Sequence, residues 1–510
     1  MRLTKLVKPA VIAAAILITV IFVVTDSRNR NGNVPFNGYM KVDGERLNVY
    51  ESEEHYYAFL PSYVSVDDVK YYGVPKDVRD NLEMMCSSSV ATIYIDTSSG
   101  NLDSIYADKE YSEPSSVRVV TSQGEKDYTG TAALSGRGNY SWSNWDKKSF
   151  SLKLEHKGDI LGLGNGKKYA LIANASDATL LRNDIGRYIE SELGVPYAHR
   201  GVYVDLYING DYMGNYYLAD KPDIGEDRID ITDMEETMDR MYGDVNVESM
   251  DVYETPLLKG WNLPSDVDDI TGGYLLEQEF SERYELEYSS IGSGATTNGG
   301  EHFVVVSPKY CTKSQINYLS DYLNKLEKVI MTEDSDRLQD CIDVESFACR
   351  YLAEEMMKNN DSGISSDYFY KDSDDVDGRL YAAPGWDYDM SLGNYLDWMN
   401  YYTQDGTGLT YLHAYDTASE WWPQLYNHKD FRERVIVLYN ECGDDIYAKI
   451  AGEYMDDMCT LLEASAAMDY VRWKYMYESN GVTNRGEEYE KLINFVNERR
   501  QYLSGVWNIE

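Results

Sequence analysis

The chain has 510 residues, 43% of them hydrophobic, which is enough for one large two-lobed domain or for two to three ordinary domains. Asp and Glu number 87 against 47 Lys and Arg, so the net charge is -40. Binding to a nucleic acid requires a basic stripe that displaces counterions, and this composition excludes nucleic acid as a partner. A site for a phosphorylated ligand must then be a local cationic pocket in a negatively charged protein.

The amino terminus differs from the rest of the chain. Arg2, Lys5 and Lys8 precede an apolar run over residues 9–24. This pattern predicts a signal anchor or a signal peptide over residues 1–25, and the lack of a small-x-small cleavage site favours the uncleaved anchor. We therefore expect a single-pass protein of the cell membrane with an extracytoplasmic domain, or a secreted protein if the signal is cleaved.

Cysteine and tyrosine usage leaves two questions open. None of the six cysteines forms a CxxC pair, which argues against a zinc site but decides nothing between one or two disulfides and free thiols. Tyrosine is frequent, at 47 residues against 10 Phe. Tyrosines suit half-buried strands as well as sugar-binding surfaces, so cell-wall glycan stays a candidate partner.

In chain order, residues 26–90 are predicted to be a linker and lead-in, because they show no strong period. From residue 91 the pattern is strand-like, with alternating or continuous apolar runs separated by Ser, Gly and Asp. The predicted strands are 91–95, 117–120, 129–134, 149–154 and 169–173. A helix follows over residues 180–193, ended by Gly194, and then a hairpin turns at Asn209-Gly210 between strands 202–208 and 212–218.

The second half is predicted to be mainly helical. Residues 220–269 are acidic and irregular, as in an insertion, and strands 273–279 and 303–306 follow. The expected helices are 315–331, 344–359, 431–442, 446–476 and 487–503, with a hairpin of residues 368–370 and 380–383 set between them. The fold class is therefore α+β and bilobal, with a β-rich lobe over 91–310, a helical lobe over 311–510 and a cleft between them as the expected site.

A glycine-rich turn is the first candidate for chemistry. Gly136, Arg137, Gly138 and Asn139 end one strand, and glycines there let backbone N–H groups approach an anion closely. An ordinary turn is the competing interpretation. An arginine between two glycines favours an anion site, because the protein is otherwise acidic.

Lysines follow this turn at positions 147, 148 and 153. Either Lys148 or Lys153 neutralises nucleotide phosphates, or these lysines only protect a strand edge. Arg182, in the first turn of the helix over 180–193, would face the cleft and contact the same phosphates.

Two carboxylate positions lie in the second half. Asp361 follows a helix in Asn359-Asn360-Asp361, where it either closes a turn or accepts the proton of a substrate hydroxyl. Asp387 and Asp389 lie two residues apart after a predicted strand, a spacing that suits a hard cation. A glycine-rich turn, lysines, a loop carboxylate and a second carboxylate pair, in this order, are what a protein kinase needs.

The chain resembles the CotH-type spore-coat protein kinase family over roughly residues 91–439. The resemblance is carried by Gly-Arg-Gly-Asn-Tyr-Ser-Trp with Lys-Lys-Ser-Phe-Ser-Leu-Lys-Leu, by Leu-Ile-Ala-Asn-Ala-Ser-Asp with Leu-Leu-Arg-Asn, by Val-Asp-Leu-Tyr-Ile-Asn-Gly-Asp-Tyr-Met-Gly-Asn-Tyr-Tyr-Leu, and by Pro-Gly-Trp-Asp-Tyr-Asp-Met-Ser-Leu-Gly-Asn. It implies a CotH-like kinase domain over 91–510 with an atypical kinase fold. It also implies that ATP and Mg²⁺ or Mn²⁺ serve to phosphorylate Ser or Thr of a secreted, coat or cell-surface protein.

By the same resemblance, Asp361 is the catalytic carboxylate, Asp389 or Asp387 the metal ligand, and Lys148 or Lys153 the nucleotide lysine. Where a kinase places a metal-binding Asn five residues after the catalytic Asp, this chain has Ser366 and then Asp367. Asp367 either replaces that ligand, or the second metal is lost. The alternatives are a non-catalytic kinase-fold surface module that binds glycan or protein, and a metal-dependent hydrolase that uses Asp387 and Asp389.

Overall fold

The computed structural model describes residues 34–52, 55–243, 245–332, 335–395, 405–411 and 419–508. The predicted signal anchor over residues 1–25 lies outside these residues. Within the described ranges, none of the helices combines the length and the apolar character that a membrane crossing needs. All six cysteines lie in these ranges, and all are free thiols.

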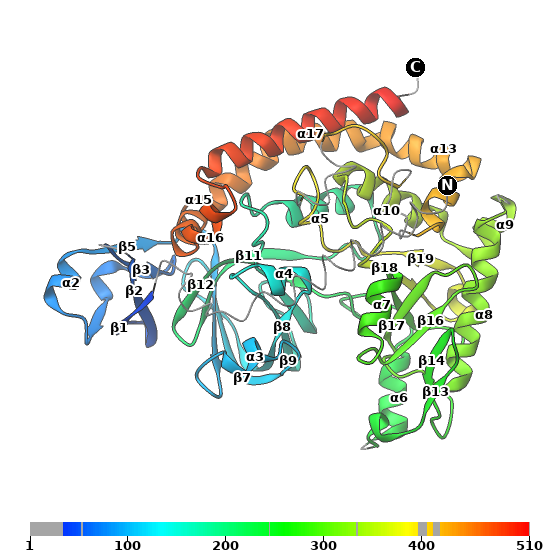
Figure 1. Ribbon diagram of the computed structural model, residues 1–510, viewed down its shortest axis with the longest axis horizontal. Coiled ribbons are helices and arrows are strands. Elements are labelled where there is room, and N and C mark those ends of the chain that lie inside the picture. The colour runs from blue at the N-terminus through cyan, green and yellow to red at the C-terminus, as the bar shows by residue number, and fades with distance from the viewer. Residues whose placement is uncertain are drawn as a thin grey trace, which may run out of the picture.

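Residues 34–86 form a five-stranded sheet instead of the expected linker and lead-in (Figure 1). Its strands are β1 (Val34–Val42), β2 (Glu45–Ser52), β3 (His55–Leu60), β4 (Lys70–Tyr72) and β5 (Leu82–Cys86), in the order β4-β1-β2-β3-β5, with the short helix α2 (Lys76–Asp80). Met40 and Val49 of this sheet pack in one core with Tyr207 and Tyr212, which belong to the neighbouring barrel. The sheet therefore buries its apolar side against another unit, so its own sequence carries only a weak pattern.

A closed seven-stranded barrel follows, and the predicted strands between residues 91 and 218 are confirmed in it. Its strands are β6 (Ala91–Thr97), β7 (Glu113–Val120), β8 (Lys126–Arg137), β9 (Ser149–Gly158), β10 (Gly166–Ile172), β11 (Gly201–Ile208) and β12 (Asp211–Asp220), in the order β10-β12-β11-β6-β7-β8-β9. The hairpin of β11 and β12 turns at Asn209 and Gly210, whose φ angles of 53° and 85° suit a tight turn of this type. The short helices α3 (Asp103–Ala107) and α4 (Tyr140–Asn144) lie between strands.

Helix α5 (Arg182–Leu193) follows β10, and Gly194 ends it with a φ of 78° as expected for a C-terminal glycine. Its buried face includes Ile185 and Ile189. Helix α10, described below, packs against it.

An open seven-stranded sheet, called the second sheet below, follows the barrel. Its strands lie on both sides of residue 310, the expected boundary between the lobes. Its strands are β13 (Val252–Glu254), β14 (Leu258–Trp261), β15 (Tyr274–Glu279), β16 (Ser293–Thr296), β17 (His302–Ser307), β18 (Asp367–Lys371) and β19 (Leu380–Ala382), in the order β13-β14-β16-β17-β15-β18-β19. Helices α6 (Met234–Tyr242), α7 (Ser281–Glu287), α8 (Lys313–Ile330) and α9 (Ser335–Cys341) accompany it (Figure 1). The segment expected as an irregular insertion, 220–269, thus supplies α6, β13 and β14.

The remaining helices are α10 (Val344–Met357), α11 (Asp374–Asp377), α12 (Trp421–Asn427), α13 (Lys429–Leu438), α14 (Asp444–Lys449), α15 (Met455–Arg472), α16 (Lys474–Ser479) and α17 (Arg485–Trp507), with π-helical turns at Tyr439–Gly443 and Ile450–Tyr454. Helix α15 packs on β12, and Trp473 lies in the barrel core, so the carboxyl-terminal helices return to the β-rich part (Figure 1). The fold is thus mixed α+β, with a β-rich amino-terminal part and a helical carboxyl-terminal part.

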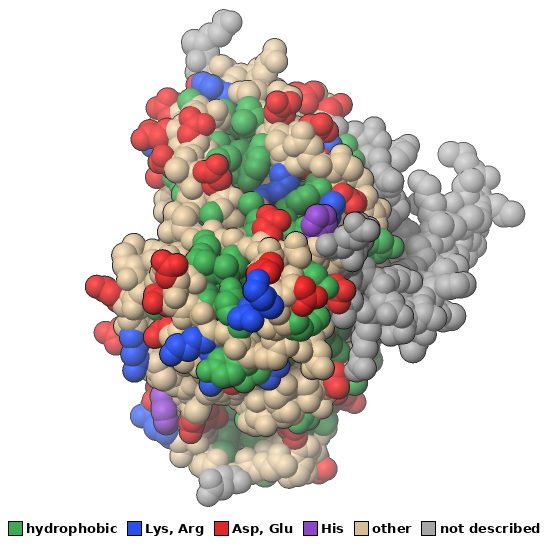
Figure 2. Space-filling model, turned by 90° about the vertical axis from the view of Figure 1, so that its left-hand side faces the viewer, with side chains coloured by type: hydrophobic (Ala, Val, Ile, Leu, Met, Phe, Trp, Pro, Cys, Tyr) green, Lys and Arg blue, Asp and Glu red, His purple; other side chains and the backbone are tan. Residues whose placement is uncertain are grey.

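Acidic side chains are frequent on the surface (Figure 2), as the net charge of -40 leads one to expect. On the face shown in Figure 2, acidic side chains are spread over the whole outline, and Lys and Arg lie among them without forming one continuous stripe.

Candidate active site

Two segments far apart in the sequence lie together at the end of α10. Residues 358–366 follow this helix, and residues 385–394 follow β19. The Asn360 N–H donates to the Met390 carbonyl over 3.1 Å, and the Leu392 N–H donates to the Met357 carbonyl over 2.8 Å. These bonds bring the segment with Asp361 next to the segment with Asp387 and Asp389, as the order of the motifs predicts.

Both segments contain non-glycine residues with left-handed backbone. The φ angles are 46° at Lys358, 60° at Ser366, 67° at Asp387 and 45° at Leu392. Such conformations are unfavourable and persist only where the surroundings fix them, as at ligand-binding and catalytic sites.

Burial and the carboxylate of Asp387 raise the pKa of both Asp361 and Asp389. Burial raises the pKa of Asp361 to about 7, with the neighbouring Asp387 as the next cause, while Arg283 opposes the shift. Burial raises the pKa of Asp389 to about 8, again with Asp387 as the next cause, although Ser176 donates a hydrogen bond of 2.9 Å to Asp389 Oδ2. Like charges gathered away from water are typical of a site that binds a cation or moves a proton.

The metal-binding capacity of this cluster is limited. Among the described residues no three His, Cys, Asp or Glu side chains lie close enough together to hold a metal ion. Magnesium in nucleotide sites is bound by one or two carboxylates together with phosphates and waters. Asp387 and Asp389 therefore fit a metal that arrives with a nucleotide better than a metal held by protein alone.

Two cations lie on the barrel side of this cluster. The Arg137 guanidinium, at the end of β8, is 5.0 Å from the centre of the Trp386 ring, directly before Asp387. Lys221 follows β12, and burial together with the nearby Arg137 lowers its pKa to about 8. In the described part of the chain neither side chain forms an ion pair within 4 Å, although Glu277 and Asp223 partly oppose the lowering of the Lys221 pKa. We call Arg137 and Lys221 the cationic pair; they are the local positive site that an acidic protein needs for a phosphorylated ligand.

Lys221 is the functional candidate that sequence reasoning missed. It lies in Asp220-Lys221-Pro222, where the chain leaves the barrel. The only sequence signal is a lysine directly after the second strand of the predicted hairpin, and that signal is weak by itself.

The lysines predicted to bind nucleotide lie elsewhere. Lys148 donates to the Trp142 carbonyl, with its ammonium 5.6 Å from the Trp142 ring centre. Lys153 is exposed on the outer face of β9, opposite Lys168. Lys147 is buried and forms an ion pair of 2.7 Å with Asp469 of α15. The structure brings none of them into contact with the three carboxylates.

The glycine-rich turn is connected to the site through Arg137, which lies over the Trp386 ring. Gly138 has a φ of 89°, and a Cβ there would lie 2.2 Å from Ser141 Oγ. A Cβ at Gly136 would lie 2.6 Å from the Trp142 ring. Asn139 donates from Nδ2 to Glu287 Oε1 of α7 over 2.7 Å, so this turn connects the barrel to the second sheet.

Arg182 and Asp367, which sequence analysis proposed as ligand contacts, are occupied by the protein. Arg182 Nε donates to the Ser391 carbonyl over 2.9 Å, and its Nη1 lies 2.5 Å from Asp177 Oδ1. Asp367 Oδ1 pairs with Arg350 over 2.9 Å, while its Oδ2 accepts from the Gly363 N–H and from Trp422 Nε1. With both oxygens in use, we assign Asp367 to the support of the loop and not to metal binding.

Arg283 of α7 is a second contact without a sequence signal. Its Nη1 donates to Ser365 Oγ over 2.6 Å, and it pairs with Glu279 over 3.3 Å. The loop that carries Asp361 is therefore held from the second sheet as well as from α10.

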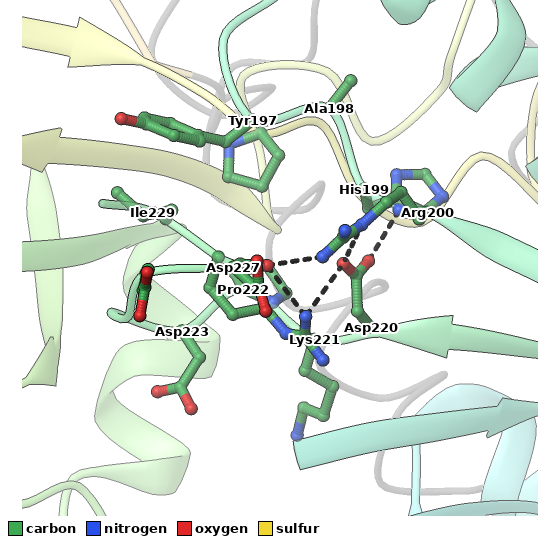
Figure 3. A pocket seen from close by; sticks show the side chains of 13 residues that line it. Tyr197, Ala198, His199, Arg200, Asp220, Lys221, Pro222, Asp223, Asp227 and Ile229 are labelled. Atoms are coloured by element: carbon green, nitrogen blue, oxygen red, sulfur yellow. Dashed lines mark hydrogen bonds and ion pairs between the residues drawn. The ribbon is translucent and has the colours of Figure 1, made fainter. Parts of the chain in front are cut away.

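A cavity of about 340 Å³ lies where the chain passes from the barrel to the second sheet (Figure 3). Its walls include Tyr197 and Pro384, and Asp220 in its wall is held by Arg200 over 3.0 Å. The other charged residues of its lining are Lys221, Asp223, Glu226, Asp227 and Arg228. The cavity shares Lys221 with the cationic pair. Its wall residue His199 packs edge-on against Trp386 with ring centres 5.3 Å apart, so the cavity adjoins the carboxylate cluster.

One of the comparisons with known proteins identifies a family. The curated proteins gave no match to the chain. The family described as CotH kinase protein matches residues 134–503, more than half of the chain, and the match includes the glycine-rich turn and all three carboxylates. The family description indicates kinase activity in general. The chain therefore belongs to the CotH kinase protein family.

Proposed function

We propose that the protein is an atypical protein kinase that transfers the γ-phosphoryl group of ATP to Ser or Thr of a protein on the cell or spore surface. The observation that carries this proposal is the pair of neighbouring cations, Arg137 and Lys221, of which Arg137 lies over the ring of Trp386, directly before Asp387. Family membership supports it independently. In this view the barrel and the helical part act as the two lobes of a kinase.

The cationic pair would bind phosphates. Among the described residues, neither Arg137 nor Lys221 forms an ion pair within 4 Å, although the more distant Glu277 and Asp223 favour the charged form of Lys221. A polyphosphate can therefore gain two charge-assisted contacts without breaking an existing ion pair. The adjoining cavity of about 340 Å³ has room for the base of the nucleotide. Lys221 takes the role that sequence analysis gave to Lys148 or Lys153.

The carboxylates would divide the remaining tasks. Asp387 and Asp389 would hold Mg²⁺ or Mn²⁺, which neutralises phosphate charge during transfer. Asp361, with a pKa near 7, is suited to accept the proton of the substrate hydroxyl. Because Asp367 is occupied by Arg350 and the loop, metal binding rests on Asp387 and Asp389 alone.

The cellular setting is part of the proposal. The basic and apolar residues 1–25 would anchor the chain in the membrane and place the kinase outside the cytoplasm. The substrate would then be a secreted, coat or surface protein.

The experiment is phosphoryl transfer by the full chain from labelled ATP to a panel of Ser- and Thr-containing peptides, with Mg²⁺ or Mn²⁺. We expect transfer by the wild type and by the control Lys153→Ala, and loss of transfer in Asp361→Asn and Asp389→Asn. Equal absence of transfer in all four proteins, with retention on cell-wall glycan, would overturn the proposal in favour of a non-catalytic binding module.

A further inference from the structure

The charge network beneath the site centres on one arginine. Arg350 of α10 is 1% exposed, and its Nη1 donates to Glu190 Oε1 over 2.9 Å and to the Tyr388 hydroxyl over 2.8 Å. Its Nη2 pairs with Asp367 Oδ1 over 2.9 Å and with Glu354 Oε1 over 2.7 Å. A planar guanidinium can satisfy four such partners at once, whereas an ammonium cannot.

One branch of this network leads to the metal-binding carboxylates. Tyr388 lies between Asp387 and Asp389, and its hydroxyl also donates to Glu190 Oε1 over 2.8 Å. The chain passes the network in direct contact: a Cβ at Gly385 would lie 1.7 Å from Glu190 Oε1 and 1.8 Å from Arg350 Nη1. The position of this segment is therefore set by Arg350 and Glu190.

The other branch leads to the loop that carries Asp361. Asp367 ends this loop and accepts from the Gly363 N–H over 2.9 Å. Glu354 accepts a short hydrogen bond from Ser362 Oγ. Both acceptors are ion-paired with Arg350, so the same guanidinium supports both sides of the site.

We propose that Arg350 is a positioning residue that sets the Asp361 loop and the Asp387–Asp389 segment relative to each other. This inference rests on the proposed function, because it gives the network a role in metal binding and phosphoryl transfer. Arg350 touches neither nucleotide nor substrate. It acts through Tyr388 on one side and through Asp367 and Glu354 on the other.

Three variants separate the branches. Tyr388→Phe removes only the hydroxyl that joins the network to the carboxylate segment. Ser362→Ala removes only the hydroxyl that joins it to the loop. Arg350→Lys keeps the positive charge but loses the planar, two-nitrogen geometry of the guanidinium. It therefore weakens both branches while Glu190, Glu354 and Asp367 keep a nearby positive charge. Tyr212→Phe is the matched control, because its buried hydroxyl donates to the Asp205 carboxylate over 2.9 Å in the barrel.

Hydrogen exchange by mass spectrometry tests the structural part. We expect faster exchange over residues 384–394 in Tyr388→Phe, over 358–368 in Ser362→Ala, and over both in Arg350→Lys, with barrel peptides unchanged. A uniform rise over the whole molecule in Arg350→Lys would overturn the inference, since it would show general destabilisation. The same conclusion would follow if only one of the two segments responded.

Metal binding and kinetics test the functional part. Loss of such supporting contacts weakens metal affinity or activity by about 10- to 100-fold, so we expect Tyr388→Phe and Arg350→Lys to weaken Mn²⁺ binding, measured by electron paramagnetic resonance with a non-hydrolysable ATP analogue, by at least about tenfold. Ser362→Ala should leave Mn²⁺ affinity unchanged and lower kcat, and Tyr212→Phe should change neither. Mn²⁺ affinity unchanged in both Tyr388→Phe and Arg350→Lys would refute the role.

The two proposals fail differently. A wild type that neither binds Mn²⁺ with the analogue nor transfers phosphate would refute the kinase assignment and the functional role of Arg350. The exchange pattern would then still decide whether Arg350 couples the two segments.

Discussion

Replacing Lys221 by arginine should change how ATP binding depends on pH. Burial and Arg137 lower the pKa of Lys221 to about 8. The charged lysine that binds phosphate is therefore lost just above neutral pH, whereas an arginine stays protonated throughout. We expect the affinity of the wild type for ATP to fall between pH 7 and pH 9 more steeply than the affinity of Lys221→Arg.

The size of the effect follows from the pKa. With a pKa of about 8, roughly nine-tenths of the Lys221 side chains are charged at pH 7 and roughly one-tenth at pH 9, so the affinity falls roughly tenfold, or about 1.4 kcal/mol. Lys221→Met removes a charge-assisted contact worth about 1.5–3 kcal/mol and should weaken binding at pH 7 by roughly 10- to 150-fold.

Isothermal calorimetry with ATP and no divalent metal measures this directly. The metal is left out because Asp389, with a pKa of about 8, ionises over the same range and would increase metal affinity as pH rises. Ionisation of the carboxylates also repels ATP, but it does so equally in Lys221→Arg. The ratio of the two affinities therefore isolates Lys221. A ratio that stays constant from pH 7 to pH 9 would refute the assignment of Lys221 to the phosphates.

Three further predictions concern stability, each read from chemical or thermal unfolding. Gly186→Ala should lower the free energy of unfolding by about 1–3 kcal/mol, because its Cβ would lie 2.2 Å from the Tyr388 ring. The control Gly505→Ala, with open space around the new Cβ, should raise this free energy by up to about 1 kcal/mol. The reverse order would contradict the packing. Lys147→Met should cost about 3–5 kcal/mol through its broken buried ion pair, and Lys153→Met less than about 0.5 kcal/mol; equal effects would be inconsistent with their burial. Without metal, Asp389→Asn should gain stability relative to the wild type as pH rises from 5 to 8, since ionising a carboxyl whose pKa is raised to about 8 disfavours the folded state; a difference independent of pH would refute this.

The elements that the sequence predicts correctly are those with local signals. Strand 149–154 shows its alternation in consecutive residues, and it is β9 of the barrel. The hairpin at Asn209-Gly210 is specified by two residues that accept positive φ. Helix α5 ends at Gly194 for the same kind of reason. In each case the information lies within about ten residues.

The elements that were missed depend on distant partners. The sheet over residues 34–86 shares its core with Tyr207, Tyr212 and Met468, so no window within it contains the apolar pattern of a complete unit. Strand β18 pairs with β15, about ninety residues earlier in the chain, and this pairing moves the division between β-rich and helical parts beyond residue 310. No local period reveals either arrangement.

The residues of the candidate site also differ in how much of their placement the local sequence reveals. Motif order predicts that the segments of Asp361, Asp387 and Asp389 lie together, and hydrogen bonds between these segments confirm that they do. A cluster of lysines in the sequence does not show where each side chain points, so it does not show which lysine faces the site. Leu152 and Leu154 point into the barrel, so the alternation itself directs Lys153 to the outside. Lys147 is captured by Asp469, more than three hundred residues later.

In a protein with such an excess of acidic residues, a cation that forms no close ion pair is informative. With 87 acidic residues against 47 basic ones, a cation in this protein readily finds a carboxylate. Buried examples are Arg182 with Asp177 and Arg499 with Glu355. A half-buried cation that keeps its charge without such a partner is unfavourable unless negative charge arrives from elsewhere. The lowered pKa of Lys221 shows this cost, and the neighbouring Arg137, which lies over the Trp386 ring, forms no ion pair within 4 Å among the described residues. A bound polyphosphate would remove this cost, which is the physical reason to place ATP there.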